Sequence, residues 1–331
     1  MTRIALIGAG LHGRNHAIAI RNMRKGGKNI EIALVIDSVE SKAAALSAEF
    51  KIPNFGTINM LKKVNVDAVD ICSPTETHLP IAKVCATLGL PTLIEKPLAS
   101  NLKDANKIIE IFKKINVNLF VGHTTRFDPS ILPFVQRVLA GEIGKVGLVE
   151  VRHWQGYSWT NGWKAWQHNS RNSGGRLIHL GIHDIDLACW MVNSKPIKVR
   201  AVGTPLVSSR KASWSSFSAQ ITFENSSIAL ITGNWDIKPA NYWRKYVAIV
   251  GSEGQISYDS NDDEISLTNF NTEPIGYEMS IQNQLSHWLD CVNGTDKPFV
   301  TIEQAQISLA TAFAAQNSAD RAGALVEISA S

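Results

Sequence analysis

The sequence predicts an α/β protein with two domains, in which a doubly wound parallel sheet comes first and an α+β domain with a large, mostly antiparallel sheet follows. Three observations predict this fold. A glycine-rich turn follows the first apolar segment, β-type and helical segments alternate up to residue 121, and longer β-rich segments with few helices follow Pro129. Regular alternation is typical of a parallel sheet covered by helices, whereas successive strands favour an antiparallel sheet.

The first element is a buried strand over residues 3–7, which runs directly into the turn Gly8-Ala9-Gly10-Leu11-His12-Gly13. A helix is predicted over residues 15–23, and a second strand over residues 30–36 ends at Asp37. In a G-x-G-x-x-G turn the first glycine permits the tight bend, the second lets the backbone approach a pyrophosphate, and the third allows the helix to pack on the strand. Because amide groups at the helix start face the phosphates, this pattern predicts a dinucleotide-binding domain of the Rossmann type.

The carboxylate of Asp37 indicates which dinucleotide binds. It can accept hydrogen bonds from both hydroxyl groups of the adenosine ribose, and it repels a 2′-phosphate. NAD is therefore favoured over NADP. Lys42, a few residues later, leaves NADP open because an ammonium group at that point can reach a phosphate.

Further βα units continue this domain. Helical segments are predicted at residues 41–50, 59–63, 76–88 and 102–115, and strands at residues 68–72, 92–95 and 118–121. Ser73, Pro74 and Thr75 follow one strand at the carboxyl edge of the sheet, where a dinucleotide lies, and His78 follows in the next helix. We therefore expect these four residues to contact the cofactor.

The second domain is predicted from longer β-rich segments. They cover residues 146–152, 197–207, 217–223, 228–234 and 246–250, and a helix over residues 304–318 and a short segment over residues 325–328 end the chain. We expect residues 1–122 to form the dinucleotide-binding domain and residues 123–331 to form a substrate-binding and oligomerisation domain. The last helix is expected to pack back on the first domain.

Composition agrees with an enzyme and argues against several other classes. The 331 residues exceed one typical domain, and 44% hydrophobic residues suffice for two cores. A net charge of +4 without a basic run gives no sign of nucleic-acid binding. The four cysteines form no C-x-x-C pattern, the start has no signal-peptide pattern, and no apolar stretch approaches transmembrane length. These features predict a soluble, cytoplasmic protein.

A lysine marks the end of the predicted strand over residues 92–95, in the triplet Glu95-Lys96-Pro97. The carboxyl end of a strand is where open α/β sheets bind their ligands. Taken alone, a lysine at such a position is more often a solvated side chain. Together with the glycine turn and Asp37, Lys96 becomes a candidate catalytic residue.

Three further signatures accompany Glu95-Lys96-Pro97. They are residues 121–129 (VGHTTRFDP), residues 174–186 (GGRLIHLGIHDID) and residues 319–326 (ADRAGALV). This combination resembles the glucose-fructose oxidoreductase and inositol dehydrogenase family (Gfo/Idh/MocA) along nearly the whole chain. The first signature is similar to the family's crossover between domains, the second to its G-G-x-x-x-D-x-x-x-H-x-x-D stretch, and the third to its carboxyl-terminal ending.

The resemblance implies an NAD(P)-dependent oxidoreductase that moves a hydride between nicotinamide and an alcohol or ketone carbon of a sugar, polyol or sugar derivative. Lys96 and His183 occupy the family's two catalytic positions, which also contact the substrate. His183, whose imidazole titrates near neutral pH, is the expected acid/base, and Lys96 is expected to stabilise negative charge on the reacting oxygen. The motifs add Glu95, Lys96 and Arg126 to the expected cofactor contacts and Thr125 to the substrate contacts.

The resemblance also leaves other properties open. Some relatives cleave glycosidic bonds through transient oxidation by bound NAD, and others bind sugar and dinucleotide without turnover and act as regulators. Lys96 and His183 argue against the regulator. The resemblance to the family further implies a homodimer or homotetramer formed through the open face of the second sheet.

His179 departs from the family pattern, which has an aspartate at this position. An imidazole offers at most one acceptor nitrogen where a carboxylate offers two oxygens. His179 is therefore an altered substrate contact, a residue that shares or takes over the acid/base role, or a sign that the chemistry has changed. The first interpretation is favoured because a pocket substitution changes specificity and keeps the reaction. A metal site of His179, His183 and Asp186 is disfavoured, and no metal is expected.

Substrate contacts are also expected in an aromatic stretch that begins at His153 and Trp154 and continues to Trp166 and Arg171. Flat apolar faces interleaved with amide and guanidinium donors suit a ring with C–H faces and many hydroxyl groups. Some of these tryptophans must instead hold the loop to the sheet. The arginines leave a phosphate or carboxylate on the substrate open.

Overall fold

The computed structural model describes residues 1–156, 173–204, 214–238, 242–260 and 277–329. The chain forms two compact units. The first comprises Met1–Ala99, Lys103–Asp128 and Gly276–Ile302, and the second comprises Ser100–Leu102, Pro129–Ile275 and Glu303–Ser331. Each unit has its own sheet.

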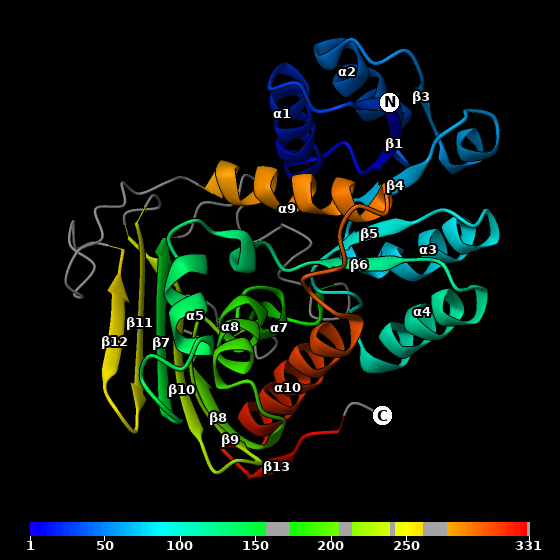
Figure 1. Cartoon of the computed structure of the whole chain (residues 1–331). Helices are drawn as coiled ribbons and strands as arrows, with labels where there is room; N and C mark the ends of the chain where they lie inside the picture. Colours follow the sequence, from blue (N-terminus) through cyan, green and yellow to red (C-terminus); the bar gives the residue numbers. More distant parts are fainter. Residues whose placement is uncertain (157–172, 205–213, 239–241, 261–276, 330–331) are drawn as a thin grey trace. The chain divides into compact units, whose positions relative to one another are not determined.

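The sheet of the first unit is parallel and has the order β3-β2-β1-β4-β5-β6 (Figure 1). Its strands are β1 (Thr2–Ile7), β2 (Ile30–Ile36), β3 (Phe55–Gly56), β4 (Ala68–Ile71), β5 (Thr92–Glu95) and β6 (Leu119–Gly122). The order reverses at β1, which pairs with β2 on one side and with β4 on the other. Ligands of doubly wound sheets bind at the carboxyl ends of the strands beside such a reversal. The predicted parallel sheet is confirmed.

Helices connect these strands as the alternation predicts. They are α1 (Leu11–Lys25), α2 (Glu40–Phe50), α3 (His78–Thr87) and α4 (Leu102–Ile115), with short 3-10 helices at η1 (Ile58–Lys62), η2 (Thr75–Thr77) and η3 (Thr124–Phe127). Helix α1 begins at Leu11 rather than at the predicted residue 15, because Gly10 is already its N-cap. The glycine turn therefore leads straight into the helix, and its last three residues belong to the first helical turn.

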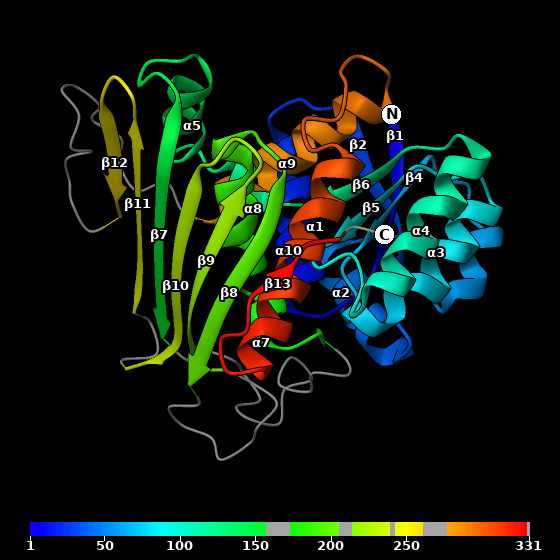
Figure 2. The same ribbon diagram turned by 90° about the horizontal axis from the view of Figure 1, so that it is seen from below.

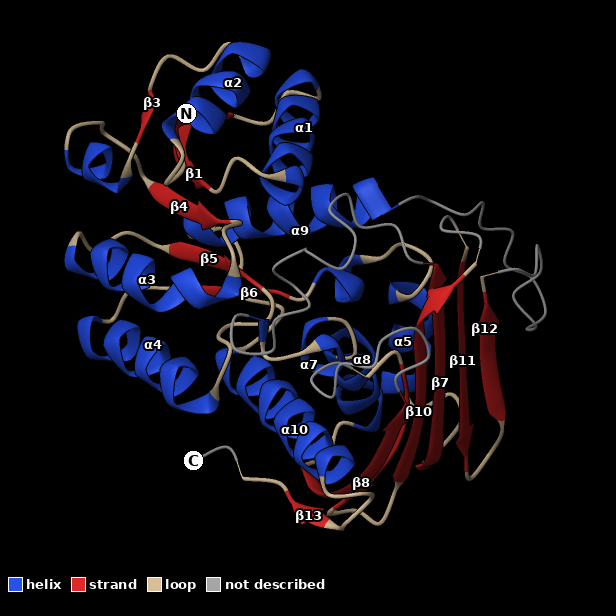
Figure 3. Cartoon of the chain, turned by 180° about the vertical axis from the view of Figure 1, so that it is seen from behind, coloured by secondary structure: helices blue, strands red, loops and turns tan. Residues whose placement is uncertain are grey.

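One helix of the first unit comes from late in the sequence. Helix α9 (Tyr277–Val292) buries Ile281, Leu285, Trp288 and Leu289 in the same core as the apolar side chains of β1 and α1, and α1 and α9 lie side by side in Figure 3. The predicted boundary between residues 122 and 123 leaves α9 in the second domain. By contrast, most of the last long helix, α10 (Ile302–Asp320), belongs to the second unit.

The second unit contains a mixed sheet with the order β12-β11-β7-β10-β9-β8-β13 (Figure 2). Its strands are β7 (Val146–Gly156), β8 (Pro196–Thr204), β9 (Ser216–Phe223), β10 (Ile228–Ile237), β11 (Trp243–Gly251), β12 (Gln255–Asp259) and β13 (Val326–Glu327). The pairs are antiparallel except for β7 and β10, which run parallel. The mostly antiparallel sheet is confirmed.

Helices cover one face of this second sheet (Figure 2). They are α5 (Leu132–Leu139), α7 (Arg176–His179), α8 (Ile182–Val192) and α10. Helix α8 is buried at nearly every position, and the side chain of Ser318 on α10 accepts a hydrogen bond of 2.8 Å from the backbone of Ala201 on β8. Val151 on β7 and Ile231 on β10 are fully buried.

A search of the described helices for a membrane span gave none that is both long enough and apolar enough.

Candidate functional site

The glycine turn between β1 and α1 is held by close backbone contacts. Gly8 has a φ of +107°, and a Cβ atom there would lie 2.7 Å from backbone atoms of Cys72 and Ser73. A Cβ atom on Gly13 would lie 1.8 Å from the carbonyl oxygen of Gly8. Only glycine fits these two positions, because any side chain would force the backbone apart. The turn thus packs α1 tightly against the end of β1.

Gly10 has a different environment, since a Cβ atom there would meet nothing within 4 Å. Leu11 follows as the first residue of α1 and is 71% exposed. The start of α1 therefore presents backbone N–H groups with open space above them, which is the cradle that a pyrophosphate requires. The residues present fit the phosphate part of a dinucleotide.

Asp37 follows β2 and is bound to the same turn. One carboxylate oxygen accepts a hydrogen bond of 2.9 Å from the N–H group of Ala9, and the other accepts one of 2.8 Å from the N–H group of Val39. Each carboxylate oxygen has a second lone pair, so Asp37 can still accept ribose hydroxyl groups. The contact with Ala9 adds a role that the sequence analysis did not predict, since Asp37 also holds the glycine turn.

Replacing Asp37 by serine is expected to raise the Michaelis constant for NAD by about 10- to 100-fold, because hydrogen bonds to a charged group are lost. The constant for NADP should change less, since a 2′-phosphate is no longer repelled. Both constants are measured under initial-rate conditions. Glu40→Gln, which removes an exposed carboxylate at the start of α2, is the matched control. A wild-type protein that prefers NADP would contradict this role.

The predicted contacts after β4 lie in a short turn. The hydroxyl groups of Ser73 and Thr77 are hydrogen-bonded at 2.7 Å, and Thr77 also donates to the carbonyl oxygen of Pro74. Thr75 is buried at the start of η2. His78 is buried as well, with its ring nitrogens 3.0 Å from the carbonyl oxygen of Ser73 and 3.2 Å from that of Leu98. His78 therefore fixes the backbone of this turn, and its buried ring offers a ligand little surface.

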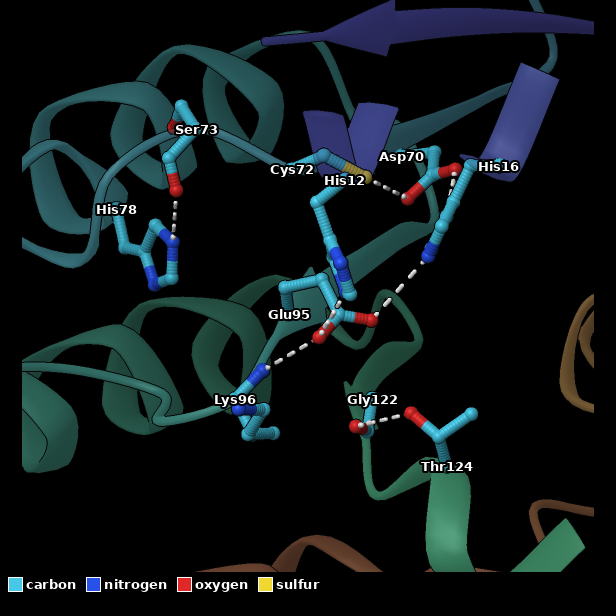
Figure 4. A network of polar contacts seen from close by, with 10 residues as sticks. All are labelled: His12, His16, Asp70, Cys72, Ser73, His78, Glu95, Lys96, Gly122 and Thr124. Atoms are coloured by element: carbon cyan, nitrogen blue, oxygen red, sulfur yellow. Dashed lines mark hydrogen bonds and ion pairs between the residues drawn. The ribbon is translucent and has the colours of Figure 1, made fainter. Parts of the chain in front are cut away.

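Glu95, the last residue of β5, is the centre of a buried polar network (Figure 4). One oxygen lies 3.1 Å from Nε2 of His12, and the other lies 3.4 Å from Nε2 of His16. Nδ1 of His16 lies 2.8 Å from a carboxylate oxygen of Asp70 on β4. Gly122 on β6 closes the space beside Glu95, since a Cβ atom there would lie 2.5 Å from Oε1.

Charge stabilises this network. Burial acts to raise the pKa of Glu95, but the imidazole groups of His12 and His16 hold that pKa well below its usual value. Burial acts to lower the pKa of His16, and Asp70, with help from Cys72, raises it well above its usual value. Of these four residues, His12 and Glu95 were predicted from the sequence, whereas His16 and Asp70 were not. The spacing of His12 and His16, four apart on one helix face, was the signal that could have found His16.

Lys96 follows Glu95 and is half-buried at the carboxyl edge of the first sheet. Its backbone N–H group donates to Glu95 at a distance of 3.2 Å. Burial lowers the pKa of the ammonium group to about 8, and the negative charge of Glu95 opposes this shift. Lys96 is therefore an unusually acidic lysine at the edge of the sheet that also carries the glycine turn.

Thr125 and Arg126 lie in η3, directly after β6. Thr125 is half-buried, whereas Arg126 is only 1% exposed. A guanidinium group so deeply buried has little surface to offer a cofactor, so the structure favours a role for Arg126 within the protein.

In the second unit, His179 ends α7 and His183 lies in the first turn of α8, and both are half-buried. Asp186 is buried and accepts a hydrogen bond of 2.8 Å from Ser308 on α10. Among the described residues, the groups with metal-binding geometry do not include His179, His183 and Asp186.

Asp184, next to His183, contacts a histidine and a lysine. Its carboxylate lies 3.1 Å from Nδ1 of His153 on β7 and 3.1 Å from Nζ of Lys245 on β11, and all three residues are buried. Burial acts to raise the pKa of Asp184, but Lys245 and His153 hold it below its usual value. The contact anchors the start of α8, and with it His183, to the sheet.

His153 and Trp154 were both expected to contact the substrate. The structure separates them, because neighbouring residues of a strand point to opposite faces. His153 faces Asp184 and the helices, whereas the ring of Trp154 lies 5.9 Å from the guanidinium carbon of Arg244. The two side chains therefore lie on opposite faces of β7, and their contacts with a substrate stay predictions. Trp166 and Arg171 lie outside the described residues.

A parallel sheet with a glycine turn at its first strand defines a dinucleotide-binding domain. A chain that contains such a domain and a second unit built on another sheet is typical of two-domain oxidoreductases. Comparison with family models agrees with this class. Residues 2–123 match the oxidoreductase family with an NAD-binding Rossmann fold (GFO_IDH_MocA), and residues 134–257 match the GFO/IDH/MocA C-terminal domain. The chain belongs to the Gfo/Idh/MocA family, as its motifs predicted.

Individual relatives are distant in sequence. The chain is 29% identical to the rhizopine catabolism protein MocA of Rhizobium meliloti over 60% of its own length and 59% of that protein's length. It is 25% identical to scyllo-inositol 2-dehydrogenase (NAD(+)) of Bacillus subtilis over 96% of its own length and 93% of that protein's. The WlbA dehydrogenase of Bordetella pertussis, solved with NADH and UDP-GlcNAcA, has a similar fold, with a TM-score of 0.86, 21% identity and coverage of 99% and 98% of the two chains.

Proposed function

We propose that the protein is an NAD-dependent oxidoreductase that transfers a hydride between nicotinamide and an alcohol or ketone carbon of a sugar, polyol or sugar derivative. The observation that carries this proposal is Lys96, a half-buried lysine with a lowered pKa at the same sheet edge as the glycine turn and Asp37. Perturbed titratable groups at such an edge are typical of functional sites. NADP remains the less favoured cofactor because of Asp37.

The chemistry divides between two side chains. Bound NAD would accept or supply the hydride at its nicotinamide ring. Lys96 donates a hydrogen bond to the reacting oxygen and stabilises the negative charge that develops there. His183 accepts the hydroxyl proton during oxidation and returns it during reduction. Asp184, tied to His153 and Lys245, positions the helix turn that carries His183.

The substrate class rests on the resemblance of these motifs to the family and on the names of the relatives. We propose Lys96, Thr125, His153, His179 and His183 as substrate contacts, with His179 as an altered contact rather than a second base. Scyllo-inositol 2-dehydrogenase and the WlbA dehydrogenase act on or bind carbohydrate-like molecules by their names, and they support a substrate with many hydroxyl groups. Because these relatives are dehydrogenases, net hydride transfer is favoured over glycosidic cleavage and over a regulatory role.

Assembly and location extend the proposal. We propose a homodimer or homotetramer in the cytoplasm. This proposal rests on the family resemblance, and Val202 on β8, Leu230 on β10 and Val250 on β11 are exposed hydrophobic residues of the second sheet.

A screen coupled to NAD reduction tests the activity. Polyols, aldoses, sugar acids and sugar nucleotides are offered with NAD, and the corresponding keto compounds with NADH, while absorbance of the reduced cofactor is followed. At least one carbohydrate should give turnover that NADP supports less well. Release of an aglycone without net change in NADH would instead show a glycosidase, and binding of NAD without turnover of any compound would favour the regulator.

A further inference from the structure

The imidazole groups of His12 and His16 lie on either side of the Glu95 carboxylate, and each points to a different oxygen of it (Figure 4). His12 and His16 lie four residues apart on one face of α1, and Glu95 comes from the end of β5. One donor atom from each residue can be chosen so that all three atoms lie within 4.8 Å of one another. The proposed hydride transfer gives the two histidines no role.

The geometry of these donors differs from that of an ordinary hydrogen-bonded cluster. Nε2 of His12, Nε2 of His16 and Oε1 of Glu95 are buried, and within the described part of the chain none of them has a hydrogen-bond partner. Yet each Nε2 atom lies close to a Glu95 oxygen, at 3.1 Å for His12 and 3.4 Å for His16. The three atoms therefore lie near one another, but their contacts do not meet the angular limits of a good hydrogen bond.

The separations also fit a metal ion. Zinc binds histidine nitrogen and carboxylate oxygen at about 2.0–2.2 Å, and a tetrahedron of that size has edges of about 3.3 Å. Two histidines and one glutamate form a known type of zinc ligand set with an open fourth position. Asp70 completes the arrangement, because its carboxylate lies 2.8 Å from Nδ1 of His16 and so leaves Nε2 of that ring for the metal.

Charge is consistent with such a site. Glu95 and Asp70 supply two negative charges, and a divalent cation would take the place of the proton that His16 holds in its absence. The side chain of His12 is 32% exposed, whereas those of His16 and Glu95 are almost fully buried. An ion would therefore enter from the His12 side. We propose that His12, His16 and Glu95 bind a divalent transition metal of the zinc type, with Asp70 orienting His16.

Binding of Co²⁺ and Zn²⁺ to the full-length protein tests this proposal without NAD or substrate, so its outcome is separate from that of the proposed function. Co²⁺ should bind once per chain and give the intense visible absorption of a four-coordinate site. Zn²⁺ should displace it and raise the melting temperature with increasing concentration. Asp70→Asn should weaken Zn²⁺ binding by about 10- to 100-fold.

His12→Leu and His12→Gln each remove one ligand at a half-exposed position, and circular dichroism verifies that they fold. Both should lose the cobalt absorption. His287→Gln is the matched control, because it removes another imidazole of the first unit that lies 3.2 Å from a carboxylate, that of Asp296, and it should keep the signal. Absence of the cobalt absorption in the wild type, or its survival in both His12 variants, would show that the cluster is only a chain of ion pairs.

Discussion

Replacement of Lys96 by methionine is expected to lower kcat by about 10²- to 10³-fold, the usual cost of removing one group that stabilises charge on a reacting oxygen. Methionine keeps the length and the apolar stem of lysine, so β5 and the following turn should remain in place. The dissociation constant for NADH should change much less than kcat, because the glycine turn and Asp37 are untouched and only the expected contact of Lys96 with the cofactor is lost. Single-turnover kinetics and NADH fluorescence titration measure the two quantities separately.

Lys103→Met is the matched control for this experiment. Lys103 is exposed on α4, so its replacement removes the same charge without touching the edge of the sheet that carries Lys96. Its kcat should equal that of the wild type. If Lys96→Met retained more than about a tenth of the wild-type kcat, Lys96 would not be the group that stabilises the reacting oxygen, and the proposed chemistry would fail at that step.

The first unit was largely predictable because its signals are local. Strands β1, β2, β5 and β6 are short apolar runs that end at or just before a polar residue or a glycine. The spacing from Gly8 to Asp37 is enough to indicate a dinucleotide fold. The second sheet was predictable as a class, but its pairing was not. The residues of β7 and β10 do not indicate that these two strands run parallel. The relative direction of paired strands depends on the connections between distant segments.

The unit to which helix α9 belongs could not be predicted from the sequence, for a different reason. Ile281, Leu285, Trp288 and Leu289 recur with the period of a helix, so the element itself was readable from the sequence. Its place in the first unit was not readable, because nearly all of that unit precedes residue 129 and α9 follows the whole second sheet. Sequence position alone therefore put the domain boundary on the wrong side of one helix.

The polar residues of the candidate site were also predictable only where their signals are local in the sequence. Lys96 and Glu95 were found because they end a strand, and His183 because it belongs to a motif. The pairing of His16 with Asp70 joins segments 54 positions apart, and His153 with Asp184 joins a strand to a helix, so each contact depends on tertiary packing. His153 and Trp154 show that adjacency in sequence does not give proximity, since alternation along β7 turns the two side chains to opposite faces.

Two glycines of the turn should respond differently to alanine. In Gly13→Ala the added methyl group would lie 1.8 Å from the carbonyl oxygen of Gly8, so the backbone must move. Overpacking of this kind costs about 1–3 kcal/mol of unfolding free energy. Because the displaced atoms form the turn itself, the affinity for NAD should also fall, by about tenfold or more. Chemical denaturation and NADH titration measure the two effects.

Gly10→Ala is the matched comparison, because it adds the same methyl group where nothing lies within 4 Å. Its backbone angles, φ −81° and ψ −169°, suit alanine, so stability without cofactor should equal that of the wild type. The methyl group would nevertheless stand where a pyrophosphate must approach the backbone, and NAD affinity should fall. Unchanged affinity in Gly10→Ala would place the pyrophosphate elsewhere, whereas unchanged stability in Gly13→Ala would show that the turn has room the structure does not reveal. We expect both variants to lose affinity for NAD, but only Gly13→Ala to lose stability. This difference would show that Gly10 leaves room for the ligand, whereas Gly13 lets α1 pack against the turn.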